Sequence, residues 1–121
     1  MRTKIGRITI ALAVAAGLVL SATAALADTF GVAATSGNRW KPAHRYISKG
    51  DRVRWRNPTG RRHTIKSYGG NWSYFKGLPS GGARTRQFDR TGTFRYRCTL
   101  HSTMNNGACS GMCGIIHVFS G

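Results

Sequence analysis

The chain has very little negative charge. Only three of its 121 residues are acidic, all of them aspartate, against 19 lysine and arginine residues, and the formal net charge is +16. Acid/base catalysis needs a titratable group held beside a reacting atom, often with a second group opposite it. The sequence offers no acid/base pair suited to making or breaking a bond on a substrate, so we expect a protein that is not an enzyme.

Helical periodicity is also absent after residue 27. Short alternating runs separated by Gly, Pro, Asn and Ser take its place, and they predict an all-β sandwich or barrel. The predicted strands cover residues 30–35, 46–48, 52–57, 63–66, 85–88, 93–98 and 114–119, and residues 68–82 are expected to form a surface connection. Alternation places Val53 and Trp55 on the inner face of one strand, and Phe94 and Tyr96 together on one face of another.

The first 27 residues have the pattern of an export signal. A basic start is followed by an apolar run over residues 8–20, and residues 25–27 fit the small-x-small rule for cleavage. The alternative is a retained membrane anchor, but the run is short for a bilayer span of about 20 residues. We predict residues 1–27 as a signal peptide and residues 28–121 as one domain. The protein would be exported (secreted, cell-surface or periplasmic), with membrane contact only through the cleaved segment.

The excess of positive charge predicts anionic partners. A strongly basic surface speeds encounters with acidic proteins and holds a protein near anionic polymers. A basic domain with interleaved aromatic residues is also typical of nucleic-acid binding, but we recognise no nucleic-acid module here. The arginines of residues 52–56 alternate with apolar residues, which indicates a strand with one solvated face. We expect a monomer with acidic protein partners, anionic cell-surface polymers as a further partner class, and no nucleic acid.

The last third of the chain carries soft metal ligands. Cys98 is followed three residues later by His101, Met112 opens the final strand, and His63 lies far upstream. Two imidazoles, one thiolate and a weak thioether are the ligands of a blue-copper electron-transfer site. A Cys-x-x-His pair alone is a weak signal, because it occurs by chance and could equally begin a zinc site.

The three cysteines bear on the choice between a copper site and a zinc site. An exported protein keeps its thiols oxidised, so an odd number leaves one cysteine that needs a reason to stay reduced. A bridge between Cys109 and Cys113 would leave Cys98 free for a metal. If Cys109 and Cys113 remained thiols, they could complete a zinc site with Cys98 and His101.

Four segments together resemble the cupredoxins of the plastocyanin, pseudoazurin and amicyanin type. They are GDRVRWRNP, RRHTIKS, FDRTGTFRYRCTLH and MCGIIHV, and they are similar to the family's Gly-Asp-x-Val-x-Trp-x-Asn, His-Thr-Ile, Gly-Thr-Phe-x-Tyr-x-Cys-x-x-His and Met-x-Gly-x-Ile-x-Val motifs. The resemblance covers nearly all of residues 28–121. It implies a single-domain, eight-stranded Greek-key sandwich with one type 1 copper per chain, held by His63, Cys98, His101 and a methionine.

Two methionines compete for the axial position. Met104 follows His101 at the short spacing of the amicyanin-like loop, whereas Met112 directly precedes the stretch that resembles the family's last strand. Choosing Met104 would leave an insertion between the ligand and that strand. We predict Met112 as the ligand, at the end of a lengthened loop that Cys109 and Cys113 staple, with Met104 exposed in that loop.

The remaining histidines and the tryptophans of the predicted domain are expected to have structural roles. His44 precedes a predicted strand and His117 alternates along the last one, so we expect surface or hydrogen-bonding roles for both. Trp40, Trp55 and Trp72 are expected to pack in the core or against loops.

Three functional hypotheses follow. The first is an electron carrier that cycles between Cu(I) and Cu(II), with the ring edge of His101 as the electron port that the resemblance implies. The second is a copper storage or delivery protein without a redox circuit. The third is a cupredoxin-like binding module that works through its basic face.

Overall fold

The computed structural model describes residues 26–121, and these residues form two β-sheets without a helix. The strands are β1 (Thr29–Ala34), β2 (Trp40–Lys41), β3 (His44–Ser48), β4 (Arg52–Arg56), β5 (His63–Tyr68), β6 (Phe75–Leu78), β7 (Ala83–Gln87), β8 (Gly92–Asn105) and β9 (Ala108–Phe119). The predicted signal peptide lies outside the described residues except for its last two positions. Within residues 26–121 no helix is long and apolar enough to cross a membrane.

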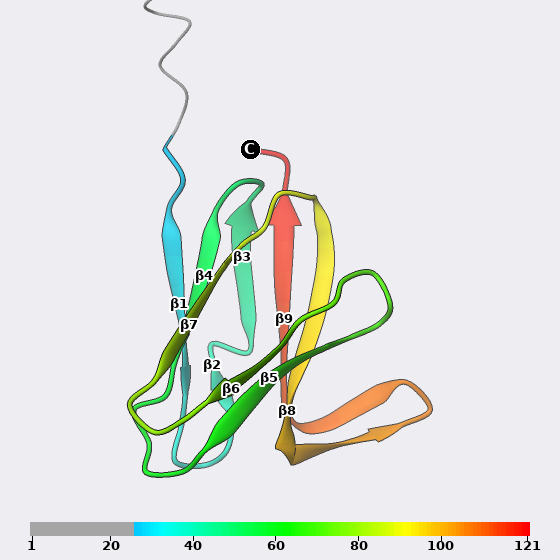
Figure 1. Cartoon of the computed structure of the whole chain (residues 1–121). Coiled ribbons are helices and arrows are strands. Elements are labelled where there is room, and N and C mark those ends of the chain that lie inside the picture. Colours follow the sequence, from blue (N-terminus) through cyan, green and yellow to red (C-terminus); the bar gives the residue numbers. More distant parts are fainter. Residues whose placement is uncertain (1–25) are drawn as a thin grey trace, which may run out of the picture.

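The two sheets face each other as a sandwich (Figure 1). The order is β2-β1-β4-β7 in one sheet and β3-β9-β8-β5-β6 in the other. Strands β1 and β4 run parallel, as do β3 and β9, and the remaining neighbours are antiparallel. The predicted all-β sandwich is confirmed. The described part has nine strands rather than the eight that the resemblance implied.

Large side chains from both sheets fill the space between them. Val53 and Trp55 are fully buried on β4, and Phe94 and Tyr96 are buried together on β8, as the alternation predicted. The rings of Trp55 and Tyr96 meet edge to face across the core, 5.3 Å between centroids, a geometry that aromatic quadrupoles favour. All three tryptophans lie in this core, which confirms their packing role.

One predicted connection contains a strand. Residues 68–82 were expected to be a surface connection, but β6 lies within them and pairs antiparallel with β5. Leu78 is fully buried and is the register partner of His63. The run Phe75–Leu78 is short and contains a glycine, so it shows no clear alternation, and its strand character comes from pairing with β5. That expectation was therefore wrong for these four residues.

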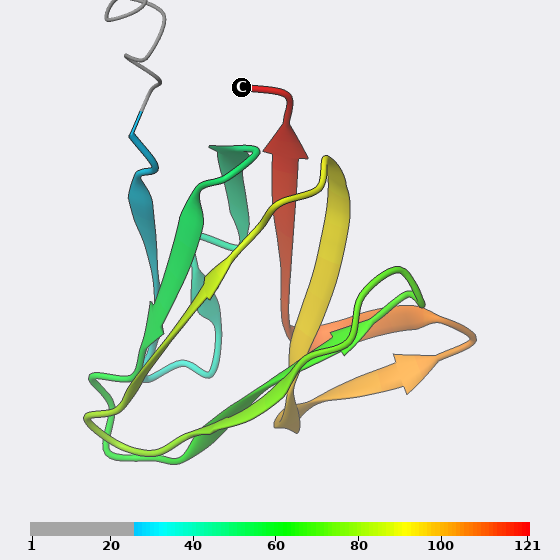
Figure 2. The ribbon, with the colours of Figure 1, turned by 45° about the horizontal axis from the view of Figure 1, so that its top comes forward.

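A second difference concerns the expected ligand loop. Strands β8 and β9 extend beyond the sandwich as a hairpin, in which residues 102–105 pair with residues 108–111. Its turn is Asn106-Gly107, and both residues have positive φ, 52° and 82°, as a two-residue type I′ hairpin requires. The hairpin projects sideways from the sandwich, drawn in orange in Figures 1 and 2. The insertion is thus an ordered β-ribbon rather than an irregular loop.

Candidate metal centre

Three of the predicted ligands meet at one end of the sandwich. The Nδ1 atoms of His63 and His101 lie 3.2 Å apart. The Cys98 Sγ lies 3.8 Å from the first nitrogen and 3.5 Å from the second. His63 and Cys98 are fully buried and His101 is half-buried, so the three donor atoms form a triangle beneath the surface.

The triangle has the dimensions of a trigonal metal site. A metal ion in the plane of two imidazoles and one thiolate, bonded at about 2.0–2.1 Å to nitrogen and about 2.3 Å to sulfur, separates its donors by about 3.5–3.8 Å. The distances of 3.2, 3.5 and 3.8 Å approach those values. Two imidazoles and a thiolate are also the equatorial donors of a blue-copper centre. The residues present therefore fit a copper ion.

A short polar network fixes the orientation of His63. Its Nε2 lies 3.2 Å from the Thr59 hydroxyl, which donates to the Asn57 Oδ1 at 2.6 Å. Asn57 is itself held by its amide, which donates to the backbone carbonyls of Arg61 and Leu78. Because the Thr59 proton points to Asn57, the His63 Nε2–H donates to Thr59. The Nδ1 then carries the lone pair that faces Cys98, in the manner of an outer-shell partner that fixes a ligand's tautomer.

Cys98 is held by the strand beside it. The Thr64 backbone N–H donates to the Cys98 sulfur at 3.4 Å. The Thr64 hydroxyl accepts from the Thr99 N–H at 2.8 Å and so ties β5 to the start of the Cys-x-x-His segment. An N–H donor stabilises a thiolate, and the same contacts leave the sulfur little room to move.

Met112 occupies the position across the sheet from the cysteine segment. β8 pairs with β9 as far as Arg97 opposite Cys113 and resumes at Ser102 opposite Gly111. Residues 98–101 therefore bulge opposite the single residue Met112, which is fully buried on the inner face. Met104 lies farther along the hairpin, is paired with Cys109, and is 36% exposed.

A disulfide spans the corner next to Met112. Cys109 and Cys113 are bonded, which confirms the predicted bridge, and Cys98 is the free cysteine. Their Cα atoms are 6.2 Å apart, whereas four residues of extended strand would span about 13 Å. The bend falls at Gly111, with φ of 102°, where a Cβ would approach the His101 carbonyl oxygen to 2.5 Å. Because both sulfurs are bonded to each other, Cys109 and Cys113 are not available for a zinc site.

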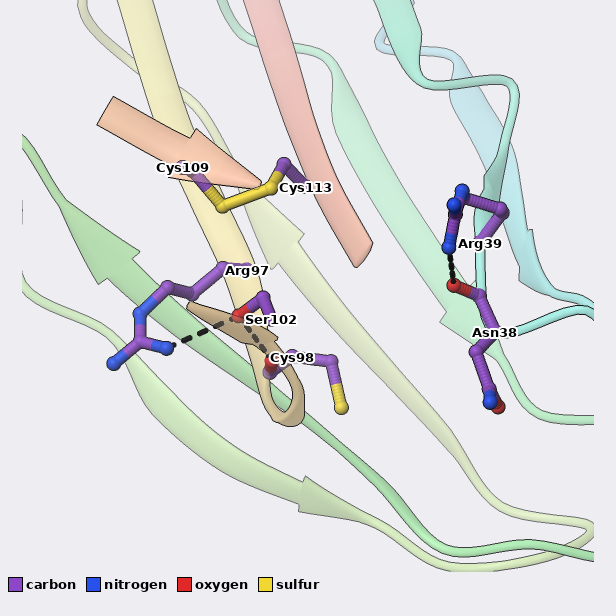
Figure 3. The surroundings of a disulfide bond; sticks show 7 residues. All are labelled: Asn38, Arg39, Arg97, Cys98, Ser102, Cys109 and Cys113. Carbon is purple, nitrogen blue, oxygen red and sulfur yellow. Dashed lines mark hydrogen bonds between the residues drawn. A yellow bond between two sulfur atoms is a disulfide. The ribbon is translucent and has the colours of Figure 1, made fainter. Parts of the chain in front are cut away.

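Figure 3 shows how the disulfide-bridged bend of β9 lies relative to Cys98 of the donor triangle. Ser102 donates to the Cys98 carbonyl and accepts from the Arg97 guanidinium at 3.0 Å. Both β8 segments that flank the bulge are thereby tied together. The Cys98 sulfur points away from the disulfide (Figure 3).

Charge is distributed unevenly between the ends of the sandwich. The Asp51 carboxylate accepts from the N–H groups of Asp28 and Ser48, at 3.0 and 2.8 Å. Asp89 follows Phe88, whose N–H donates to the Asp51 carbonyl at 2.9 Å. All three acids therefore lie at the end where β4 begins, opposite the end that holds the donor triangle (Figure 1). Burial first, then the charges of His101 and Arg61, lower the pKa of His63 and so favour its neutral ring.

The supporting residues were not identified from the sequence. Asn57 ends the predicted strand 52–57, Thr59 lies between two predicted strands, and Thr64 lies within the predicted strand 63–66, so their positions alone do not indicate a role at the site. Their role depends on contacts with His63 and Cys98, and the sequence signal available was the short spacing of Asn57 and Thr59 ahead of His63.

Comparisons with known proteins identify the fold. Neither the scan of protein-family models nor the search of curated proteins finds a match. Among solved structures, a purple cupredoxin from Nitrosopumilus maritimus is 18% identical with a TM-score of 0.58, covering 74% of this chain and 98% of that one. A reduced amicyanin variant is 20% identical with a TM-score of 0.59, covering 81% and 87%. A copper-containing nitrite reductase from Thermus scotoductus is 22% identical with a TM-score of 0.63, covering 77% and 23%.

These similarities show a cupredoxin-like fold, as the sequence motifs implied. The identities are low, so the similarity by itself carries the fold and no particular activity. Only 23% of the nitrite reductase chain is covered, so the match concerns one part of that enzyme.

Proposed function

From its cupredoxin-like fold and its donor triangle, we propose that the chain is an exported type 1 copper protein that carries single electrons. The observation that carries the proposal is the triangle of His63 Nδ1, His101 Nδ1 and Cys98 Sγ, with sides of 3.2–3.8 Å. One copper ion per chain would sit among these atoms and supply one-electron chemistry between Cu(I) and Cu(II). Met112, buried opposite the bulge, would supply the weak axial sulfur.

The protein contributes a set of metal-donor atoms that are held in fixed positions and largely shielded from water. His63 and Cys98 are buried and held by Thr59 and Thr64, so the donors need to rearrange little when the charge of the centre changes. Donor atoms that are already in place before the charge changes keep the reorganisation free energy of the electron transfer low. His101 alone reaches toward solvent, so electrons would enter and leave through its imidazole. The three aspartates of the described residues lie at the opposite end of the sandwich.

The charge distribution supports acidic redox partners. Arg61 and Arg62 are exposed beside His63, while the three aspartates lie at the far end. An acidic protein would thus be attracted to the end where electrons exit, and such steering raises association rates about 10- to 1,000-fold. Export is supported by the Cys109–Cys113 disulfide, because disulfides persist in oxidising compartments.

The direct test is a Cu(II) titration of purified protein followed by its visible spectrum. We expect an intense blue, green or purple band that saturates at one copper per chain, because a copper–thiolate bond gives strong charge transfer. Cys98→Ser should abolish the band, and Ser110→Ala on the hairpin should leave it unchanged. No band, or a band that persists in Cys98→Ser, would remove the central claim.

Voltammetry of the loaded protein then separates the alternatives. A fast, reversible couple is expected of a carrier. Copper that binds without a reversible couple would instead indicate storage or delivery, and absence of copper binding would leave a cupredoxin-like binding module.

A further inference from the structure

A second pair of histidines lies on the outer face of the five-stranded sheet. His44 begins β3 and His117 lies in β9, and these strands run parallel with His44 opposite Ile115 and Tyr46 opposite His117, so the two histidines are diagonal neighbours. Both side chains point outward, because they alternate with the buried residues Ile47, Ile116 and Val118. The His44 Nδ1 and the His117 Nε2 are 2.9 Å apart. This bears out the hydrogen-bonding role expected for both residues, but it also brings two metal-binding atoms together.

Stacked aromatic rings hold the pair in place. The Tyr46 ring lies against the His117 ring, with centroids 4.5 Å apart and planes 11° from parallel. Phe119 continues the stack beyond Tyr46, at 6.2 Å. Among the described residues, the one hydrogen bond of either imidazole is the bond to the other. His44 is exposed and His117 is half-buried, so the pair lies at the surface of the sheet.

The separation of the two nitrogens suits a shared ion. Two imidazoles bonded at about 2.0–2.1 Å in neighbouring coordination positions have their nitrogens about 2.9 Å apart at a right angle and about 3.3 Å apart at a tetrahedral angle. The pair on the outer face has 2.9 Å, and the pair in the buried centre has 3.2 Å. The two pairs are therefore about equally well spaced for one ion.

We propose that His44 and His117 form a second, exposed metal site that binds Cu(II), with water completing its coordination. Neutral imidazoles are good ligands for copper and zinc, and among divalent first-row ions Cu(II) binds such donors most tightly. In the ion-free pair one ring donates its N–H to the other. On binding, that ring takes its other tautomer through exchange with water. Because the two nitrogens face each other along the line between the ring centres, which are 5.2 Å apart, each ring also turns by about 45° so that both lone pairs converge on an ion about 2.0–2.1 Å away.

The site would differ from the buried centre in its properties. It has no thiolate, so bound Cu(II) would give only weak visible absorption, and its open water positions would let the ion exchange quickly. A bound ion would also cross-link β3, an edge strand, to β9. The inference does not depend on the proposed electron-carrier function, because none of its residues belongs to the donor triangle.

The test isolates the pair by disabling the buried centre. In a His63→Ala/Cys98→Ser protein, we expect one Cu(II) per chain with micromolar affinity in calorimetry, and an electron paramagnetic resonance signal with nitrogen coupling. Adding His117→Gln or His44→Gln should weaken that binding at least tenfold. Ser48→Ala, an exposed change on the same β3 strand, should leave it unchanged. Unaltered binding in the histidine variants, or no binding at micromolar Cu(II), would overturn the proposal and leave a hydrogen-bonded pair.

A second measurement uses the intact chain, in case the doubly substituted protein does not fold. Substoichiometric Cu(II) added to wild-type protein whose buried centre is blocked with one equivalent of diamagnetic mercury(II) should broaden the nuclear magnetic resonance signals of His44, Tyr46 and His117. Signals in the sheet formed by β1, β2, β4 and β7 should stay sharp. Broadening spread over the basic surface, or absent at the pair, would contradict the assignment.

Discussion

The five-stranded sheet carries two imidazole pairs whose nitrogens are similarly spaced but whose surroundings differ. His63 and His101 lie beside a thiol, and His63 and Cys98 are fully buried. His44 and His117 stand on the outer face, and within residues 26–121 no cysteine or carboxylate joins them to form a group of three ligands. The spacing of the nitrogens thus suits metal binding at both pairs, whereas a neighbouring thiolate and burial, which suit a redox centre, belong to only one of them.

The two pairs also differ in how they are supported. Asn57 and Thr59 fix the tautomer of His63 through hydrogen bonds, whereas Tyr46 supports His117 by ring stacking alone. Each pair contains one histidine whose pKa is lowered. For His63 the causes are burial, His101 and Arg61, and for His117 they are burial, His44 and Arg95. Oriented hydrogen bonds and burial should therefore separate the two sites in affinity and in exchange rate.

The largest expected difference between the pairs is in copper-induced stability. A ligand present at 1,000 times its Kd stabilises the folded state by about 4 kcal/mol, whereas one present at its Kd adds about 0.4 kcal/mol. Cu(II) at a concentration near the Kd of the exposed pair should saturate the buried centre. Thermal unfolding should therefore show a large copper-induced rise in midpoint that His63→Ala removes and His117→Gln preserves. Equal loss in both variants would mean that the two pairs do not differ as described.

The next prediction concerns the support of His63. Thr59→Val keeps the size of the side chain but removes the acceptor for the His63 Nε2–H, so the correct tautomer is no longer favoured. Loss of such an outer-shell partner typically lowers metal affinity 10- to 100-fold. Competition with a chelator should show this loss, while the exposed pair keeps its affinity. Thr85→Val, an exposed threonine on β7, is the matched control. An unchanged affinity in Thr59→Val would show that burial alone holds His63.

The same contrast explains what the sequence could predict. The donors His63, Cys98 and His101 were expected because their ligand types suit copper and because four motifs resemble the cupredoxins, and the structure brings all three together. The inward positions of Val53, Trp55, Phe94 and Tyr96 followed from alternation within single strands. Local patterns were sufficient wherever the feature itself is local.

The features that were missed depend on long-range pairing. His44 and His117 are separated by 73 positions, and only the parallel register of β3 and β9 brings them together. Strand β6 likewise acquires its character from β5. The hairpin was the exception. Asn106-Gly107 is a strong local signal for a type I′ turn, but only a lengthened loop was predicted at this place.

The axial position provides the third prediction. Met112 is buried opposite the bulge, whereas Met104 is partly exposed on the hairpin. A weak axial thioether mainly tunes the potential of a copper site. Met112→Leu should therefore keep copper and colour but raise the reduction potential measured by voltammetry. Met104→Leu serves as the matched control and should change the potential little. The reverse result would assign the ligand to the hairpin and overturn the position proposed for Met112.

The smallest expected effect concerns the charge around the two ends of the molecule. Arg61 is exposed beside His63, and Lys49 is exposed in the turn between β3 and β4, at the end that holds the three aspartates. Arg61→Glu and Lys49→Glu change the net charge by the same amount, so a rate that depends on total charge would fall equally in both. Steering toward His101 predicts a several-fold slower oxidation of the reduced protein by ferricyanide, an anion, in Arg61→Glu only. Stopped-flow rates should converge as salt shortens the Debye length below about 10 Å. Equal slowing in both variants would show that the anion is attracted to the molecule as a whole and not to the end with the donor triangle.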